Sequence, residues 1–98
     1  MTFKNYKLRT VTTIQGITPS TYPCTVIGLS IANTGASTAT ANAYVTNGTN
    51  TYIVKNISIP LGCAQVVVGG EQKLVLVTGD VVNIVSDIAV DVIMSVLE

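Results

Sequence analysis

The chain has 98 residues, five basic and five acidic residues, and no histidine or tryptophan. A chain of this length can build one modest hydrophobic core, which excludes two ordinary domains. An apolar share of 48% with only 10% charged residues excludes intrinsic disorder, because disorder requires low hydrophobicity and high net charge.

The low charge also indicates what kind of partner to expect. Neutral polar residues, above all Thr, replace the missing charges, and such a surface loses little when another protein covers it. We therefore expect a subunit of a larger assembly, with a neutral monomer as the alternative. The balanced charges give no electrostatic footprint for nucleic acid. No apolar run reaches the roughly 20 residues of a membrane span, and the first residues have no apolar segment of a signal peptide.

Composition and turn signals predict an all-β fold. Val, Ile and Thr number 15, 10 and 14 residues, and these β-branched side chains favour strands. Turn signals recur at Asn33-Thr34-Gly35, Asn47-Gly48, Pro60-Leu61-Gly62, Gly69-Gly70 and Gly79-Asp80. We predict an antiparallel β-sandwich or jelly-roll-like barrel of about eight short strands. The predicted strands lie near residues 5–14, 24–33, 38–46, 51–58, 63–68, 72–78, 80–86 and 90–97.

Residues 1–23 are predicted to differ in role from the single β-sandwich domain at 24–98. They form either an N-terminal arm or a first strand, followed by an irregular stretch over 15–23 that contains two prolines. Arms of this kind often join subunits. Residues of both segments are therefore the candidate contact residues: Phe3, Lys4, Tyr6, Lys7, Arg9, Pro19, Tyr22 and Pro23. The three cations among them suit a solvated strand end or an acidic neighbour better than a phosphate groove.

Alternation along the next two strands predicts which side chains are buried. Ile27, Leu29 and Ile31 share one face of 24–33, and the odd-numbered residues from Ala39 to Val45 share one face of 38–46. Asn47-Gly48 predicts a two-residue type I′ hairpin, since both residues tolerate positive φ. The predicted core residues are Ile27, Leu29, Ile31, Val45, Val54, Leu74, Leu76, Ile84, Val92 and Met94.

The C-terminal segment fits two patterns. Polar residues recur every four positions from Asn83 to Ser95, which would suit a helix with a polar stripe. Against the helix, this segment is rich in Val, a poor helix former. Val90, Val92 and Met94 also alternate with polar residues at strand spacing. We favour two strands.

The residues offer little for chemistry, and we expect no enzyme, no cofactor and no metal site. Histidine-dependent zinc, Ser-His-Asp and Cys-His sites are excluded. Asp80 is expected to cap a turn, and Asp87 with Asp91 supplies too few oxygens for calcium. Cys24 and Cys63 could pair only if their Cα atoms lie within about 7 Å. Without a secretion signal, two buried free thiols are favoured.

Seven segments of the chain, taken in order, form a recognisable pattern of strands and turns: Thr25–Asn33, Ala43–Val45, Tyr52–Asn56, Ile59–Gly62, Lys73–Leu76, Thr78–Val81 and Asp91–Glu98. This succession resembles a group of small β-rich virion proteins of tailed bacteriophages, including marine cyanophages. The resemblance covers residues 24–98, about three quarters of the chain. It consists of strand and turn patterns and carries over no functional residue.

The resemblance implies a non-catalytic capsid decoration (cement) protein, located in the virion after assembly in the bacterial cytoplasm. Its partners would be the major capsid protein or other virion proteins. Composition adds the expectation of a homo-oligomer, with a trimer favoured. The alternative is a neck, tail or fibre component with a receptor- or glycan-binding role, for which Tyr44 and Tyr52 near the hairpin are the candidates.

Overall fold

The computed structural model describes residues 2–69 and 73–98, which form nine strands and no helix. The predicted turn at Gly69-Gly70 and the start of the predicted strand 72–78 fall partly outside the described residues. The all-β prediction is confirmed. The strands are β1 (Phe3–Val11), β2 (Gln15–Ile17), β3 (Cys24–Asn33), β4 (Ala39–Thr46), β5 (Asn50–Ile59), β6 (Ala64–Val68), β7 (Leu74–Leu76), β8 (Val81–Ser86) and β9 (Val90–Leu97).

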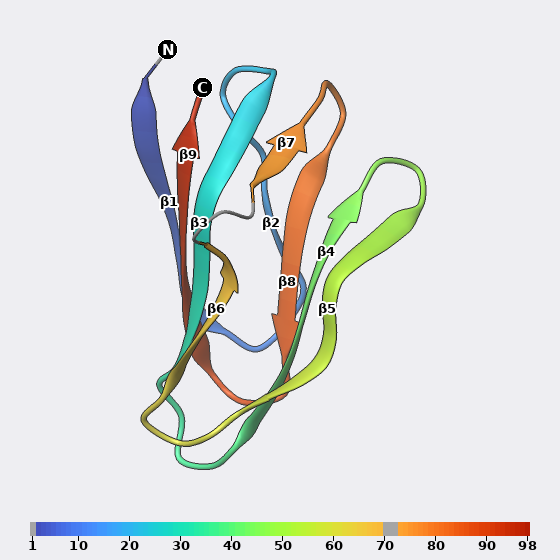
Figure 1. The fold of residues 1–98 in the computed structure, drawn as a ribbon. Helices are drawn as coiled ribbons and strands as arrows, with labels where there is room; N and C mark the ends of the chain where they lie inside the picture. Colours follow the sequence, from blue (N-terminus) through green and yellow to red (C-terminus); the bar gives the residue numbers. More distant parts are fainter. Residues whose placement is uncertain (1, 70–72) are drawn as a thin grey trace.

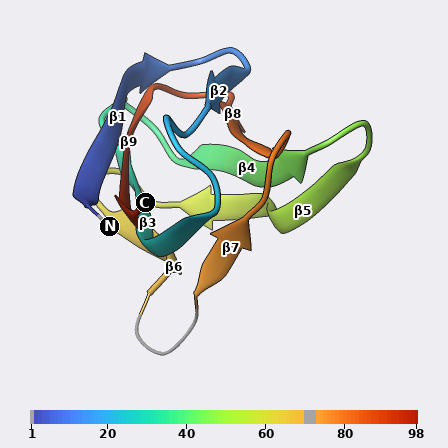
Figure 2. The ribbon, with the colours of Figure 1, turned by 90° about the horizontal axis from the view of Figure 1, so that it is seen from above.

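The strands form two antiparallel sheets in a sandwich (Figure 1). One sheet has the order β1-β9-β3-β6, with β7 also paired to β3, and the other has the order β2-β8-β4-β5. Most connections cross from one sheet to the other, so each sheet is assembled from strands far apart in the sequence. Figure 2 shows the two sheets from above, with the β4–β5 hairpin reaching out beyond the other strands.

The core lies between the sheets and follows from alternation along the strands. In β9, Val90, Val92, Met94 and Val96 are fully buried, and in β8 the inward residues are Val82, Ile84 and Ser86. The C-terminal segment therefore forms two strands, as predicted. The alternative helix would have placed this apolar set on several faces of one cylinder, where a single neighbouring layer could not cover it.

A β-bulge explains the main error in the predicted core. Six predicted residues are buried: Leu29, Ile31, Leu76, Ile84, Val92 and Met94. Val45, Val54 and Leu74 are half-buried and pack against that core. Ile27 was predicted to share the buried face of Leu29 and Ile31. It is only half-buried, whereas Val26 is fully buried. The register with β9 shifts between Val26 and Gly28, and the extra residue reverses the alternation before Leu29.

The β4–β5 hairpin is real, but its turn differs from the prediction. Thr46 pairs with Asn50, which leaves a three-residue loop in place of two residues. Gly48 has a φ of +79°, and the Asn47 N–H donates to the Thr49 carbonyl at 3.3 Å. A type I′ turn would require positive φ at two consecutive residues. Here Gly48 alone supplies it within the loop.

Residues 1–23 contribute two strands to the sandwich. β1 pairs with β9 from Phe3↔Leu97 to Val11↔Val90, so the first-strand alternative describes this segment and a free arm does not. β2 lies inside the stretch that we expected to be irregular, and it pairs with β8. Ile17 explains this departure, because its side chain is 3% exposed and strand pairing opposite Val82 is what places it in the core.

Candidate functional site

The candidate contact residues of β1 divide between its two sides. Phe3, Lys7 and Arg9 are exposed, and Phe3 is 73% exposed. Lys4 and Tyr6 instead turn toward the end of β9, where both contact Glu98. The sequence grouped these five residues, whereas strand alternation separates them because neighbouring side chains point to opposite faces.

The candidates of the segment before β3 mostly serve the fold. Pro19 is buried and Pro23 is exposed, and the Tyr22–Pro23 peptide bond is cis. Tyr22 is half-buried, and its hydroxyl donates to the Asp80 carbonyl. Burial, with the nearby charge of Asp80, raises the pKa of Tyr22 above its ordinary value. Tyr22 thus fastens this segment to the turn before β8.

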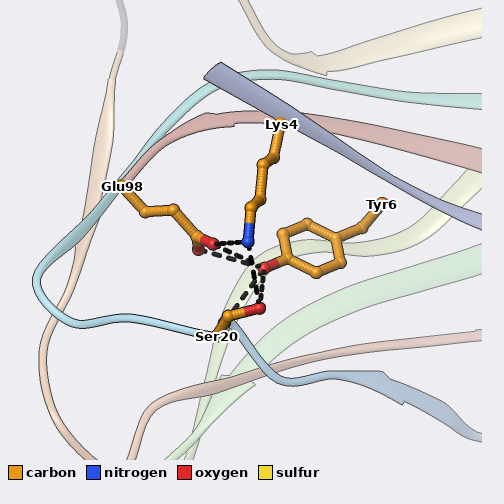
Figure 3. Close-up of polar contacts among 4 residues, drawn as sticks. All are labelled: Lys4, Tyr6, Ser20 and Glu98. Atoms are coloured by element: carbon orange, nitrogen blue, oxygen red, sulfur yellow. Dashed lines mark hydrogen bonds and ion pairs between the residues drawn. The ribbon is translucent and has the colours of Figure 1, made fainter. Parts of the chain in front are cut away.

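Four polar side chains converge where β1 begins and β9 ends (Figure 3). The Glu98 carboxylate lies 3.0 Å from the Lys4 ammonium and accepts a hydrogen bond from the Tyr6 hydroxyl at 3.0 Å. Tyr6 also accepts from the Ser20 N–H at 3.0 Å, and Lys4 donates to the Ser20 hydroxyl at 3.4 Å. We call Lys4, Tyr6, Ser20 and Glu98 the terminal cluster. It joins β1, β9 and the segment that precedes β3.

Sequence reasoning named Lys4 and Tyr6 as contact residues, but it considered Glu98 only as one of the acidic residues and did not pair it with them. The Glu98 side chain is only 2% exposed. More than 90 residues separate Glu98 from its partners. Only the register of β1 against β9 brings Glu98 next to Lys4 and Tyr6, and this register cannot be predicted from local sequence. The arrangement satisfies the carboxylate with a cation and a phenol, which is what a buried charge requires.

The pKa values of the terminal cluster reflect this pairing. Burial alone would raise the pKa of the Glu98 carboxyl, but hydrogen bonds from Lys4 and Tyr6 and the charge of Lys4 outweigh it and lower the pKa. The pKa of Lys4 is raised, chiefly by its hydrogen bond to Glu98 and by the carboxylate charge. Both shifts favour the ion pair.

Acid is expected to weaken the fold through Glu98. Because its pKa is lower in the folded chain, the contribution is present above the ordinary value of 4.5 and is lost as the pH falls through the folded value. Urea unfolding from pH 7 to pH 2 should show a smaller loss of stability for Glu98→Gln than for the wild type. Lys4→Gln should shift the acid transition to higher pH. Identical pH profiles for all three proteins would contradict this role.

The aspartates hold backbone amides at turns and strand irregularities. Asp80 follows Gly79, whose φ is +96°, and the turn closes with the Asp80 N–H donating to the Val77 carbonyl at 2.9 Å. Each of three carboxylates accepts a hydrogen bond from one backbone N–H: Asp80 from Val77 (2.9 Å), Asp87 from Thr40 (2.7 Å) and Asp91 from Thr10 (2.9 Å). Asp80 thus caps its turn as expected. The described residues contain no group of three acidic or cysteine side chains able to hold a metal ion.

The two cysteines are free, and their environments differ. Cys24 is buried at the start of β3, and burial raises the pKa of its thiol to about 11, with a further contribution from the charge of Glu98. Cys63 is exposed, which corrects the expectation of two buried thiols. The Cys63 N–H donates to the Pro60 carbonyl and the Cys63 carbonyl accepts from the Asn33 N–H, so its backbone is held in place while its side chain is exposed.

The strand register defines which residues lie on the outward face of the first sheet. Residues directly opposite one another across the strands lie on the same face. We call three consecutive rows of this face the outer rows: Phe3, Leu97, Thr25 and Val75 in the first; Asn5, Ser95 and Gly28 in the second; and Lys7, Ile93, Ser30 and Val66 in the third. A fourth row on the same face, with Asp91, Ala32 and Ala64, lies beyond them.

The outer rows expose large apolar side chains. Val66 is 63% exposed, Val75 58% and Ile93 48%, besides Phe3. Lys7 is the one charged residue of the eleven. In the middle row, Gly28 has no side chain, and the nearest atoms to a Cβ placed there belong to Ser95 at 3.7 Å. Several large apolar side chains exposed on one face are typical of interaction sites on soluble proteins.

Comparison with protein-family models, with curated proteins and with solved structures gave no match. The described residues form no pocket. Nor do they include a helix with the length and hydropathy to span a membrane.

A second exposed feature lies on β5, in the hairpin that reaches out from the sandwich (Figure 2). Tyr52 is 44% exposed, its ring centroid lies 5.1 Å from that of Tyr44, and the Lys55 ammonium lies 5.1 Å from the Tyr52 ring. Both neighbours contact the ring through its π-system. A sugar stacking on Tyr52 would have to share the ring with them.

Proposed function

We propose that this chain is a non-catalytic structural subunit that acts by packing against other proteins. The outer rows carry the proposal, because they present exposed apolar side chains with one charge on a rigid sheet. Burial of that face is favourable and requires little desolvation of charge. The described carboxylates support the same conclusion, because each already has a structural partner. Asp80, Asp87 and Asp91 accept hydrogen bonds from backbone amides, and Glu98 contacts Lys4 and Tyr6.

We further propose that the assembly is the virion of a tailed phage and that the chain is a capsid decoration protein. The resemblance of residues 24–98 to small β-rich virion proteins supports this, as does the neutral surface. Its partners would be the major capsid protein or other virion proteins, and self-association would accompany binding. Many weak contacts repeated over a shell give strong total attachment, so one modest face per copy suffices.

Mass spectrometry of purified virions tests the proposal. Particles made from the genome that encodes the chain should contain it in many copies, at a fixed ratio to the major capsid protein. The capsids of particles that lack it should disassemble at a lower temperature than those of complete particles. Absence of the chain from purified virions would refute the virion assignment, although contact with other proteins could still be its role.

The exposed Tyr52 ring favours one alternative, a neck, tail or fibre component that binds a receptor or glycan. Sugars are recognised by stacking on aromatic faces, and this hairpin offers the one such exposed ring of the β4–β5 pair. A glycan array distinguishes the two functions. Retention of the wild type and its loss in Tyr52→Ala would support the alternative, and no retention would remove it.

A further inference from the structure

The outer rows have an internal symmetry. On β9 and β3, the residue of the first row resembles the residue of the third row in size and polarity, whereas Phe3 and Lys7 of β1 differ. Leu97 corresponds to Ile93 on β9, and Thr25 corresponds to Ser30 on β3. At the far edge, Val75 of β7 corresponds to Val66 of β6. The small middle row, with Ser95 and Gly28, lies halfway between them.

From this pattern we infer that two copies of the chain pack face to face through their outer rows. The two-fold axis would run across the strands through Ser95. Such an axis brings the first row of one copy over the third row of the other, and the same contacts occur twice, as an isologous interface requires. Leu97 then meets Ile93 of the second copy, Thr25 meets Ser30 and Val75 meets Val66.

The alternative axis, along the strands, fits the side chains less well. It would place Leu97 and Ile93 of β9 over Thr25 and Ser30 of β3, so that apolar groups would cover hydroxyls. The small residues on the proposed axis also let the two sheets approach closely at their centre, since Gly28 adds no side chain there.

Charge also fits the proposed axis. Lys7 of one copy lies over Phe3 of the other, where the aromatic face attracts an ammonium group. The two Lys7 ammonium groups stay about four residues apart along the strands, roughly 13 Å, so salt screens their repulsion. Edge-to-edge pairing through β1 would instead bring Lys7 and Arg9 near their own copies, which is how charged edge strands prevent association.

The size of the face sets the strength of the dimer. Four strands about 4.8 Å apart, over about six residues of 3.3 Å each, give a face of roughly 400 Å². A standard interface covers about 800 Å² per partner. The dimer should therefore be weak and reversible, and it should form at high concentration. The inference rests on the proposed action through protein contacts: a second copy covers the outer rows in solution and, because this dimer is weak, a virion protein can replace that copy on the same face.

Sedimentation equilibrium of the purified chain, from about 10 µM to 1 mM, should show two copies at the upper end. Ile93→Lys should weaken the association at least about tenfold, because it brings an ammonium group into the apolar contact. Ile14→Lys is the matched control, since Ile14 is 62% exposed and lies outside the outer rows. It should leave the association unchanged. An unchanged melting temperature at 10 µM would show that both variants fold.

Two further variants test the axis itself. Phe3→Lys should weaken the dimer at least about tenfold, because it opposes Lys7 of the second copy. Phe3→Glu should keep the dimer and make it sensitive to salt, because the new carboxylate faces that same ammonium. One copy at every concentration, three copies, or equal loss in Phe3→Glu and Phe3→Lys would overturn the inference. None of these results bears on whether virions contain the chain.

Discussion

Replacing Met94 by Ala is expected to lower the free energy of unfolding by about 3 kcal/mol. Met94 is fully buried at the middle of β9, the strand that pairs with both β1 and β3. The substitution removes apolar surface from the core and leaves a cavity that close-packed neighbours cannot fill. Urea unfolding at about 5 µM, below the concentration of self-association, measures the loss.

The neighbouring residue supplies the control. Ile93 is 48% exposed on the outer face, so Ile93→Ala should change the stability of the monomer by less than about 0.5 kcal/mol. The two substitutions remove similar amounts of side chain from adjacent positions of one strand. Equal losses would show that β9 does not have one buried and one exposed face, and the outer rows would then be wrongly assigned.

Replacing Asn33 by Ala should cost about 3 kcal/mol, although Asn33 lies at a turn. Its side chain is 5% exposed. The amide donates to the carbonyls of Ser37 at 2.8 Å and Ile59 at 2.9 Å, and its oxygen accepts from the Gly35 N–H at 2.9 Å. Loss of the side chain leaves these backbone groups without partners away from water, which is the costly case.

Asn42 provides a matched control for Asn33. Its side-chain oxygen accepts one hydrogen bond, from the Asn56 N–H at 2.8 Å, and the residue is only half-buried. Asn42→Ala should cost about 1 kcal/mol or less, since water can replace the lost partner. Thermal or urea unfolding of the two variants gives the comparison. If Asn33→Ala cost no more than Asn42→Ala, the three bonds of Asn33 would not hold the turn.

Local pattern was sufficient to predict most strands. Alternation in β4 and β9 identified Ala39, Ala41, Val92 and Met94 as inward, because a strand has a period of two and one face must be buried. The same rule failed at Ile27, where the bulge in β3 adds one residue. A bulge depends on the register of the neighbouring strand, and that information is not local.

The candidate site was less predictable than the strands. Sequence reasoning placed contacts on an arm and on the stretch 15–23, but β1 and β2 are paired strands and Pro19 is buried. The pattern did single out Phe3 and Lys7, which lie on the outer rows. It did not identify Ile93, Val66 or Val75, because their exposure depends on which side of a strand faces the second sheet.

The amino-acid sequence by itself determined the fold class, the approximate strand positions and the low charge of the surface. These depend on side-chain branching, on period-two alternation and on composition, all of which act over a few residues. Only the tertiary structure decided the strand order, the contact of Glu98 with Lys4 and Tyr6, and the alignment of the outer rows. Those features join residues as far apart as Phe3 and Leu97. Their positions depend on the packing of two complete sheets against each other, and the sequence of a single segment does not determine that packing.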